Sequence, residues 1–231
     1  MRLNSQGITT SIFAFLTIPV MTFHLNTSGA IAQEYTLTPI PTLGGPTNYA
    51  KGLNNAGIAT GYSSMDADPG GDIYAYIWNS TNGAMTIIES MDNKNTWGTA
   101  INEMGDITGR FKLVSGLHHS FLYQGGLFVD LQLGSPDGLS WGNGVNDAGA
   151  VAGNMSTLAK LWEGGTELTL PPLAGPWTPT CAMDINNAGI IAGHTDTYGN
   201  GNYGLIWHFD NDPLTNDVHR LGGFKQNPFL G

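Results

Sequence analysis

The stretch Leu53-Asn54-Asn55-Ala56-Gly57-Ile58-Ala59-Thr60-Gly61 occurs four times along the chain with small changes. The second position is asparagine and the fifth and ninth positions are glycine in every copy. The other copies cover residues 101–109, 145–153 and 185–193. Their asparagines stand 48, 44 and 40 residues apart. A period of that length accommodates one small sheet per copy and predicts an array of similar units.

Each unit divides into four short extended segments. In the second unit these segments cover residues 97–101, 106–109, 120–123 and 127–131. They are rich in β-branched and aromatic residues and are separated by Gly/Asn turns, which is typical of antiparallel hairpins. Four strands in roughly 45 residues is the size of one propeller blade. The sequence therefore predicts an all-β fold, a β-propeller-like array of four four-stranded antiparallel blades.

The fixed asparagine and glycine have a local explanation in the turn between the first two strands. A tight hairpin often needs one residue at positive φ, which glycine adopts without steric cost. The asparagine can hydrogen-bond to the turn backbone. We therefore interpret Asn54 and Gly57, and their counterparts, as structural rather than catalytic residues.

Residues 35–45 resemble a fourth segment followed by the Leu-Gly-Gly ending seen again at Leu221-Gly222-Gly223. They predict an extra N-terminal strand that could pair with the last blade and close the ring. Their prolines suit an edge position. An open stack and a fragment of a larger ring are the alternatives.

The repeats resemble the HAF family of extracellular repeats of bacterial exported proteins. That family follows an I-N-x-x-G-x-V-x-G phrase with H-A-F-L-W, a glycine turn and a strand ending in L-G-G. The nearest copy of the name-giving stretch is His119-Ser120-Phe121-Leu122-Tyr123. The resemblance extends over residues ~42–223 and implies an exported, propeller-like protein. The family has no general activity that the resemblance could assign to residues of this chain.

Residues 1–32 are predicted to be a secretory signal peptide. An apolar run at 12–21 precedes an A-x-A cleavage motif at Ala30-Ile31-Ala32, which predicts a mature start at Gln33. An uncleaved membrane anchor is the alternative, although Pro19 interrupts the short run. We expect a mature domain over residues 33–231, with repeats at about 46–90, 91–134, 135–175 and 176–223. Its location would be secreted, periplasmic or at the cell surface, without a membrane span after cleavage.

The composition narrows the choice of partners. The net charge is −10, from 8 basic and 18 acidic residues, and no basic cluster is evident in the sequence. Because affinity for a phosphate backbone needs clustered cations, nucleic acid is not an expected partner. A glycan, a cell-surface protein or a cation fits better. The single cysteine, Cys181, cannot form an internal disulfide and falls at an apolar repeat position.

A binding face is expected at the end of the array where the repeats disagree. One end carries the uniform Asn-x-x-Gly turns, whereas the other carries connections of irregular length and content, such as 63–72, 110–117 and 194–202. Function is usually carried by variable loops on a rigid frame. Within these connections Trp177 and Tyr198 are the candidate binding residues.

A weak Ca²⁺ candidate lies in one of these connections. Asp66, Asp68 and Asp72 present three carboxylates, and hard oxygen ligands suit Ca²⁺. The pattern is not an EF-hand loop, and a solvated acidic turn is the alternative. No other cofactor is expected.

No catalytic motif is evident, so the sequence favours a non-catalytic protein without deciding whether it is an enzyme. We expect an exported, non-catalytic binding or structural module. The alternative is a secreted carboxylate-based hydrolase or lyase on the same scaffold, with acidic residues supplied by different blades.

Overall fold

The structure is a computed structural model. It describes residues 35–65, 71–90, 95–132, 138–172, 179–197, 201–208 and 218–221. Of these, residues 196–197, 201–202 and 218–221 are described as backbone only. The chain forms two compact units, Met1–Thr38 and Pro39–Gly231. Only residues 35–38 of the first unit are described, and they are exposed without regular structure. The predicted signal peptide therefore lies outside the described residues.

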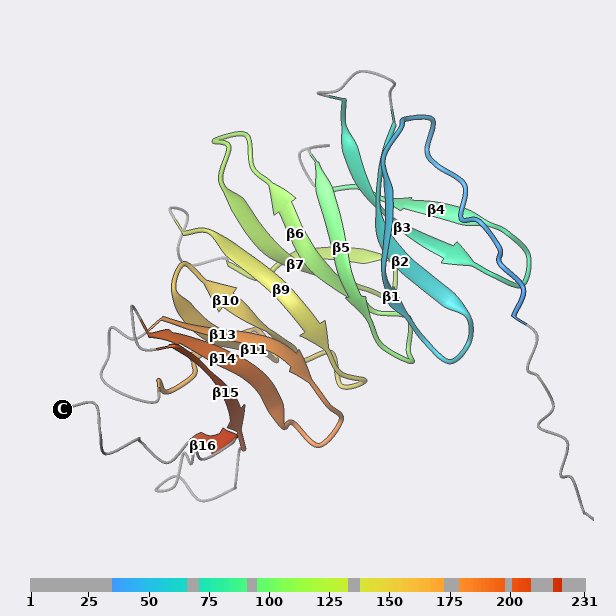
Figure 1. The fold of residues 1–231 in the computed structure, drawn as a ribbon. Coiled ribbons are helices and arrows are strands. Elements are labelled where there is room, and N and C mark those ends of the chain that lie inside the picture. The colour runs from blue at the N-terminus through green and yellow to red at the C-terminus, as the bar shows by residue number, and fades with distance from the viewer. Residues whose placement is uncertain are drawn as a thin grey trace, which may run out of the picture. The chain divides into compact units, whose positions relative to one another are not determined.

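The described part of the chain is all-β, with four antiparallel sheets of four strands each and no helix (Figure 1). The first sheet contains β1 (Asn48–Leu53), β2 (Ile58–Ser64), β3 (Ile73–Asn79) and β4 (Met85–Ile88). The second contains β5 (Thr96–Ile101), β6 (Ile107–Lys112), β7 (His118–Gln124) and β8 (Leu127–Asp130). The third contains β9 (Ser140–Val145), β10 (Val151–Met155), β11 (Leu158–Glu163) and β12 (Thr166–Thr169). The fourth contains β13 (Thr180–Ile185), β14 (Ile191–Thr197), β15 (Gly201–Trp207) and β16 (Val218–Leu221).

The strands within each sheet follow the order of the sequence. Neighbouring sheets touch through the first strand of the following sheet, because β5 contacts β1, β2 and β3, β9 contacts β5, β6 and β7, and β13 contacts β9, β10 and β11. No strand of the first sheet makes comparable contact with the fourth sheet within the described residues. The four antiparallel sheets agree with the predicted all-β fold, and none of the sheets formed by the described residues is closed.

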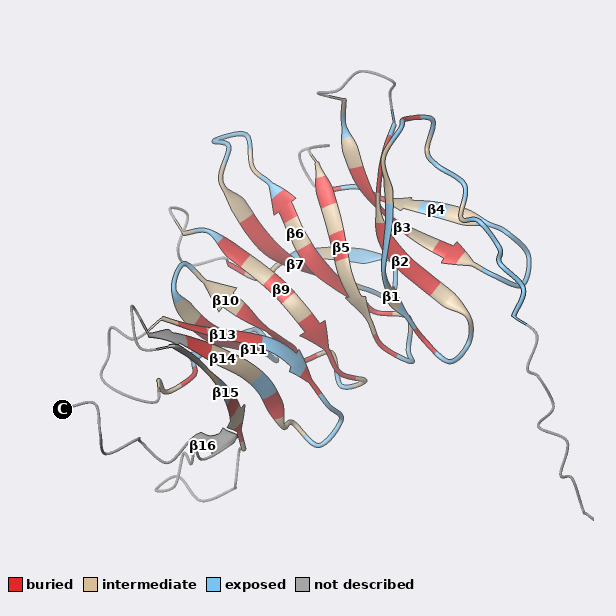
Figure 2. Cartoon of the chain, viewed as in Figure 1, coloured by how far each residue is buried: buried red, intermediate tan, exposed pale blue. Residues whose placement is uncertain are grey.

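The hydrophobic core lies between successive sheets, where buried residues gather in Figure 2. Ala75 and Ile88 of the first sheet meet Ile107, Phe111 and Phe121 of the second. Full burial of one such large side chain stabilises the fold by about 1.5–3 kcal/mol. Equivalent clusters join the second sheet to the third and the third to the fourth. Each sheet is therefore stabilised mainly by its neighbours.

A β-bulge interrupts the first strand of every sheet at the same place. The bulge leaves one extra residue, such as Thr99 in β5, unpaired with β6. Directly beside it, a Cβ added at Gly109 would collide with the carbonyl oxygen of Trp97. This close approach accounts for the fixed glycine at the ninth position of the repeated phrase.

The predicted N-terminal strand is wrong for the described residues 35–47, which form no strand. Pro39 and Pro41 have no backbone N–H to donate to a ladder. The segment instead follows the first sheet: the side-chain amide of Asn48 donates to the carbonyls of Ile40 (3.0 Å) and Pro41 (2.9 Å). Ile40 packs on a buried cluster that includes Trp78, so the segment from Pro39 onwards lies on the face of the first sheet that points away from the second sheet.

Some connections at the irregular end are shorter than the sequence indicates. Residues 110–112, expected in a loop, belong to β6, and Leu113 and Leu117 close the turn through a 2.8 Å backbone hydrogen bond. Similarly, β14 extends to Thr197 and β15 begins at Gly201. The side chain of Phe111 explains the first difference, because it is 3% exposed and belongs to the core between the first two sheets.

Candidate functional site

Four of the five predicted site residues, Trp177, Tyr198, Asp66 and Asp68, lie outside the described residues. Asp72 is exposed, and its backbone carbonyl accepts a 2.9 Å hydrogen bond from Met65. No group of three or more His, Cys, Asp or Glu side chains is placed to hold a metal ion within the described ranges. The Ca²⁺ hypothesis and the two binding residues remain predictions.

The repeated asparagine has two structural tasks, as Asn54 illustrates. Its side-chain oxygen accepts hydrogen bonds from the backbone N–H groups of Ala56 (3.1 Å) and Ile58 (3.0 Å), which fixes the turn. Its side-chain amide donates to the carbonyl of Asn102 in the next sheet (3.1 Å). Gly57 adopts φ +74°, as predicted for the turn.

The same inter-sheet bond recurs along the array. Asn102 donates to the carbonyl of Asn146 (2.8 Å), and Asn146 donates to that of Asn186 (3.3 Å). A second row runs beside it, because the backbone N–H of Glu103 donates to Asp147 (2.9 Å) and that of Asp147 to Asn187 (2.9 Å). The first three asparagines are only 5–6% exposed. The repeated phrase therefore connects neighbouring sheets, and the side chains of its first three asparagines are used in hydrogen bonds within the fold.

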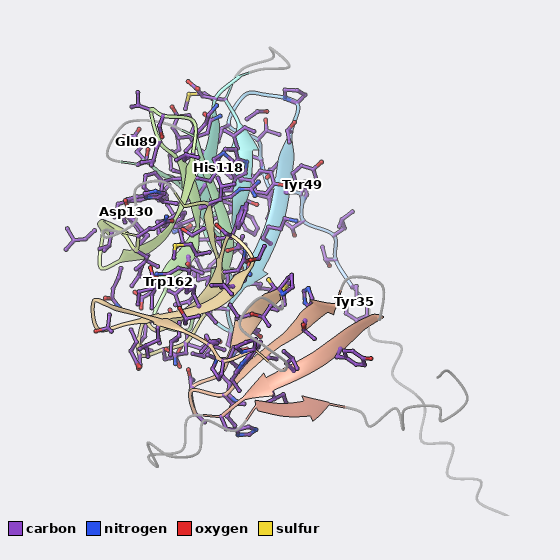
Figure 3. The ribbon with its side chains drawn as sticks, turned by 90° about the vertical axis from the view of Figure 1, so that its left-hand side faces the viewer. Tyr35, Tyr49, Glu89, His118, Asp130 and Trp162 are labelled. Atoms are coloured by element: carbon purple, nitrogen blue, oxygen red, sulfur yellow. The ribbon has the colours of Figure 1, made fainter. Side chains whose placement is uncertain are left out.

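A cleft of about 510 Å³ lies between the second and third sheets. It is formed by the hairpins β7–β8 and β11–β12 together with the turn at Ala148 and Gly149. Apolar lining comes from Leu122, Val129 and Trp162. Figure 3 shows Asp130 and Trp162 on one side of the sheets and Tyr49 on the other. The cleft lies at the end of the uniform turns, away from the irregular connections.

Three carboxylates line this cleft, from two different sheets: Asp130 of β8, and Glu163 and Glu167 of the β11–β12 hairpin. Asp130 lies 2.9 Å from Nδ1 of His119, which is 3% exposed. Glu167 lies 2.7 Å from Nζ of Lys160 and also accepts a 3.3 Å hydrogen bond from the Trp162 indole. Glu163 is exposed, and its carboxylate has no ion-pair partner within the described part of the chain.

Sequence reasoning missed this cleft. Trp162 is 3% exposed and packs in the core, but part of its side chain also reaches the cleft. The available signal was the pair Glu163 and Glu167 flanking the Gly164–Gly165 turn, which places two carboxylates at the end of one hairpin.

Cys181 is half-buried beside Asn143 and Asn154. Its Sγ lies 3.3 Å from the side-chain oxygen of Asn154 and 3.6 Å from the side-chain amide of Asn143. Burial raises the pKa of the thiol, and the Asn143 hydrogen bond lowers it by less. Although His194 is the cross-strand neighbour of Cys181, a thiol kept protonated is a poor nucleophile. The arrangement supports the packing role expected from the sequence.

Comparisons with known proteins give no identity. No family model matches the chain, and no match was found among curated proteins. The resemblance to HAF repeats therefore stays a prediction. Within the described residues there is no helix long and apolar enough to cross a membrane.

Proposed function

We propose that the chain is an exported, non-catalytic binding module that holds its ligand in the cleft between the second and third sheets. The observation that carries this proposal is the volume of that cleft, about 510 Å³, with walls from two sheets. Small-molecule sites typically occupy about 300–1,000 Å³ and combine apolar walls with a few polar groups. The hairpins on either side of the cleft supply both the apolar walls and the polar groups.

A saccharide unit fits the lining of the cleft. Leu122, Val129 and the edge of Trp162 offer an apolar surface to the C–H face of a sugar ring. Asp130, Glu163 and Glu167 can accept hydrogen bonds from sugar hydroxyl groups. These carboxylates disfavour an anionic ligand, so a neutral glycan is the expected class.

A propeller-like arrangement is part of the same proposal. The first strand of each following sheet contacts the preceding sheet, whereas the fourth strands of the described sheets make no comparable contact between sheets. This difference supports fourth strands at the outside and first strands nearest a common axis. Export rests on the apolar run and A-x-A motif of residues 1–32. Amino-terminal sequencing of the mature protein tests it: a start at Gln33 supports export with cleavage, and an intact Met1 contradicts it.

Cleft binding is tested by filling the cleft. The mature chain is first applied to a glycan array, and the best neutral oligosaccharide is then titrated calorimetrically. Val129, 38% exposed, lines the cleft, whereas Leu127 of the same strand is 71% exposed and does not. Val129→Trp should weaken binding about tenfold or more, and Leu127→Trp should preserve it. Equal binding by both variants, or no neutral glycan bound by the wild type, would contradict the proposal.

A carboxylate-based hydrolase or lyase remains the second candidate, because acidic residues from two sheets line the same cleft. The contacts of Asp130 with His119 and of Glu167 with Lys160 occupy two of the three carboxylates, which disfavours it. A generic glycosidase and lyase panel distinguishes the candidates. Turnover by the wild type that is lost in Glu163→Gln would replace the binding module with an enzyme.

The prediction of binding at the irregular end through Trp177 and Tyr198 is a separate proposal. Their alanine variants, titrated with the same oligosaccharide, test it without altering the cleft.

A further inference from the structure

Two basic side chains contact one indole on the second sheet, and a third lies beside one of them. The guanidinium carbon of Arg110 lies 5.0 Å from the ring centre of Trp97, and the ring of His118 lies 5.1 Å from it. Lys112 is the direct cross-strand neighbour of His118. Arg110 and Lys112 are two residues apart on β6, so both project from the same face of the sheet. We call Trp97, Arg110, Lys112 and His118 the basic cluster.

No carboxylate neutralises the basic cluster within the described part of the chain. The ion pairs found there are His119–Asp130 and Lys160–Glu167. The Nε of Arg110 is buried without a hydrogen-bond partner. Burial, followed by the charges of Arg110 and Lys112, lowers the pKa of His118. Such a grouping is unexpected in a chain with 18 acidic and 8 basic residues, because a carboxylate neighbour would lower its electrostatic free energy.

The scaffold itself does not require these cations, as the other sheets demonstrate. In the second sheet, Trp97 of the first strand is the cross-strand neighbour of Arg110 of the second strand. Every other sheet has a residue pair at the same place. The equivalent pairs are Tyr49 with Tyr62, Trp141 with Asn154, and Cys181 with His194. None of these three pairs contains Lys or Arg, and the sheets form with the same strand order. The basic cluster is therefore a local addition to the second sheet.

We propose that the basic cluster binds a carboxylate group of a ligand. Arg110 offers a planar set of N–H donors that matches a carboxylate, and Trp97 holds its guanidinium in place through the cation–π contact. Lys112 is exposed and adds a second positive charge, and His118 is half-buried and adds a ring N–H donor. A bound carboxylate would offset the positive charges of Arg110 and Lys112.

This site is independent of the cleft. It uses β5, β6 and β7, near the Leu113–Leu117 turn, and none of its residues lines the cleft. The ligand classes also differ, because the cleft is lined by carboxylates and the basic cluster by cations. The carboxylate could belong to a small free acid or to a uronic acid in a saccharide, and the experiment separates these sources.

The test is calorimetric titration of the mature chain with acetate, trigalacturonate and neutral maltotriose. Arg110→Gln removes the central charge, and Lys51→Gln is the matched control, since Lys51 is an exposed cation near Tyr49 on the first sheet. Thermal unfolding confirms that each variant is folded. Exposed Lys112→Gln provides a second variant that leaves the buried contacts intact.

We expect at least one carboxylate probe to bind, with affinity about tenfold lower in Arg110→Gln, lower by a smaller factor in Lys112→Gln, and unchanged in Lys51→Gln. Binding of trigalacturonate alone assigns the site to an acidic saccharide, and binding of acetate as well assigns it to the free group. Failure of both carboxylates to bind, or equal affinity in Arg110→Gln and the wild type, would overturn the proposal. Binding of maltotriose that Arg110→Gln leaves unchanged reports on the cleft and does not rescue this site.

Discussion

The side-chain amide of Asn54 donates a hydrogen bond to the backbone carbonyl of Asn102, 3.1 Å away and 48 residues later in the chain. Asn102 and Asn146 repeat the bond to the next sheet, so one residue type fixes its own turn and joins two sheets. Asn186 fixes its turn in the same way, with its side-chain oxygen accepting from Ala188 (3.0 Å) and Ile190 (2.9 Å). It is exposed, however, and its amide has no partner within the described residues. Asn186 therefore serves as a control, because it fixes its turn but donates no hydrogen bond to another sheet within the described residues.

The segment before β1 should stabilise the first sheet. Ile40→Asp places a charge against the cluster of Ala59, Tyr76 and Trp78, and we expect a loss of about 2 kcal/mol in the free energy of unfolding. Leu37→Asp is the control, because Leu37 is 94% exposed, and its effect should stay within about 0.5 kcal/mol. Urea unfolding measures both. Equal stability of the two variants would mean that Ile40 does not cover the sheet.

The buried cation of the third sheet should depend on its carboxylate. Lys160 is 5% exposed, and its Nζ contacts Glu167 (2.7 Å) and the hydroxyl of Thr169 (2.8 Å). Glu167→Gln leaves a positive charge without a counterion, which we expect to cost about 2 kcal/mol after allowance for the partial exposure of Glu167. Glu163→Gln, on the same hairpin but without an ion pair, should change stability by less than about 0.5 kcal/mol. The unfolding curves should therefore separate the two variants.

The thiol of Cys181 should react slowly at neutral pH and should ionise only at a raised pH. Burial holds its pKa above the ordinary value of a thiol. The rate of alkylation by iodoacetamide should therefore rise with pH through a higher midpoint in the folded protein than in urea. Because the unfolded thiol loses its proton first, the stability that this group contributes is present at neutral pH and is lost as pH rises through the folded pKa. Rapid alkylation at pH 7 would contradict the assignment.

The strands and their turns were predictable because their signals are local. The segment 97–101 lies within β5, and the repeated glycines have the positive φ that a tight turn requires. Alternation of β-branched residues and Asn/Gly turns is sufficient for these features.

Features that depend on the spacing between sheets were not predictable. The hydrogen bond from Asn54 to Asn102 depends on the position of one turn relative to the turn of the next sheet, and no local sequence pattern encodes that position. The cleft depends on how far the β7–β8 and β11–β12 hairpins separate. The basic cluster unites Arg110 and His118 only because β6 continues beyond the predicted loop boundary at residue 110.

The most direct test of the account compares Asn54→Asp with Asn186→Asp by urea unfolding of the mature chain. Both substitutions retain the side-chain oxygen that fixes the turn, but only Asn54→Asp removes a donor between sheets and sets a carboxylate against the carbonyl of Asn102. Asn54→Asp should lose about 2–3 kcal/mol in the free energy of unfolding, and Asn186→Asp less than about 0.5 kcal/mol. Equal losses in the two variants would contradict the claim that the repeated asparagine joins the sheets.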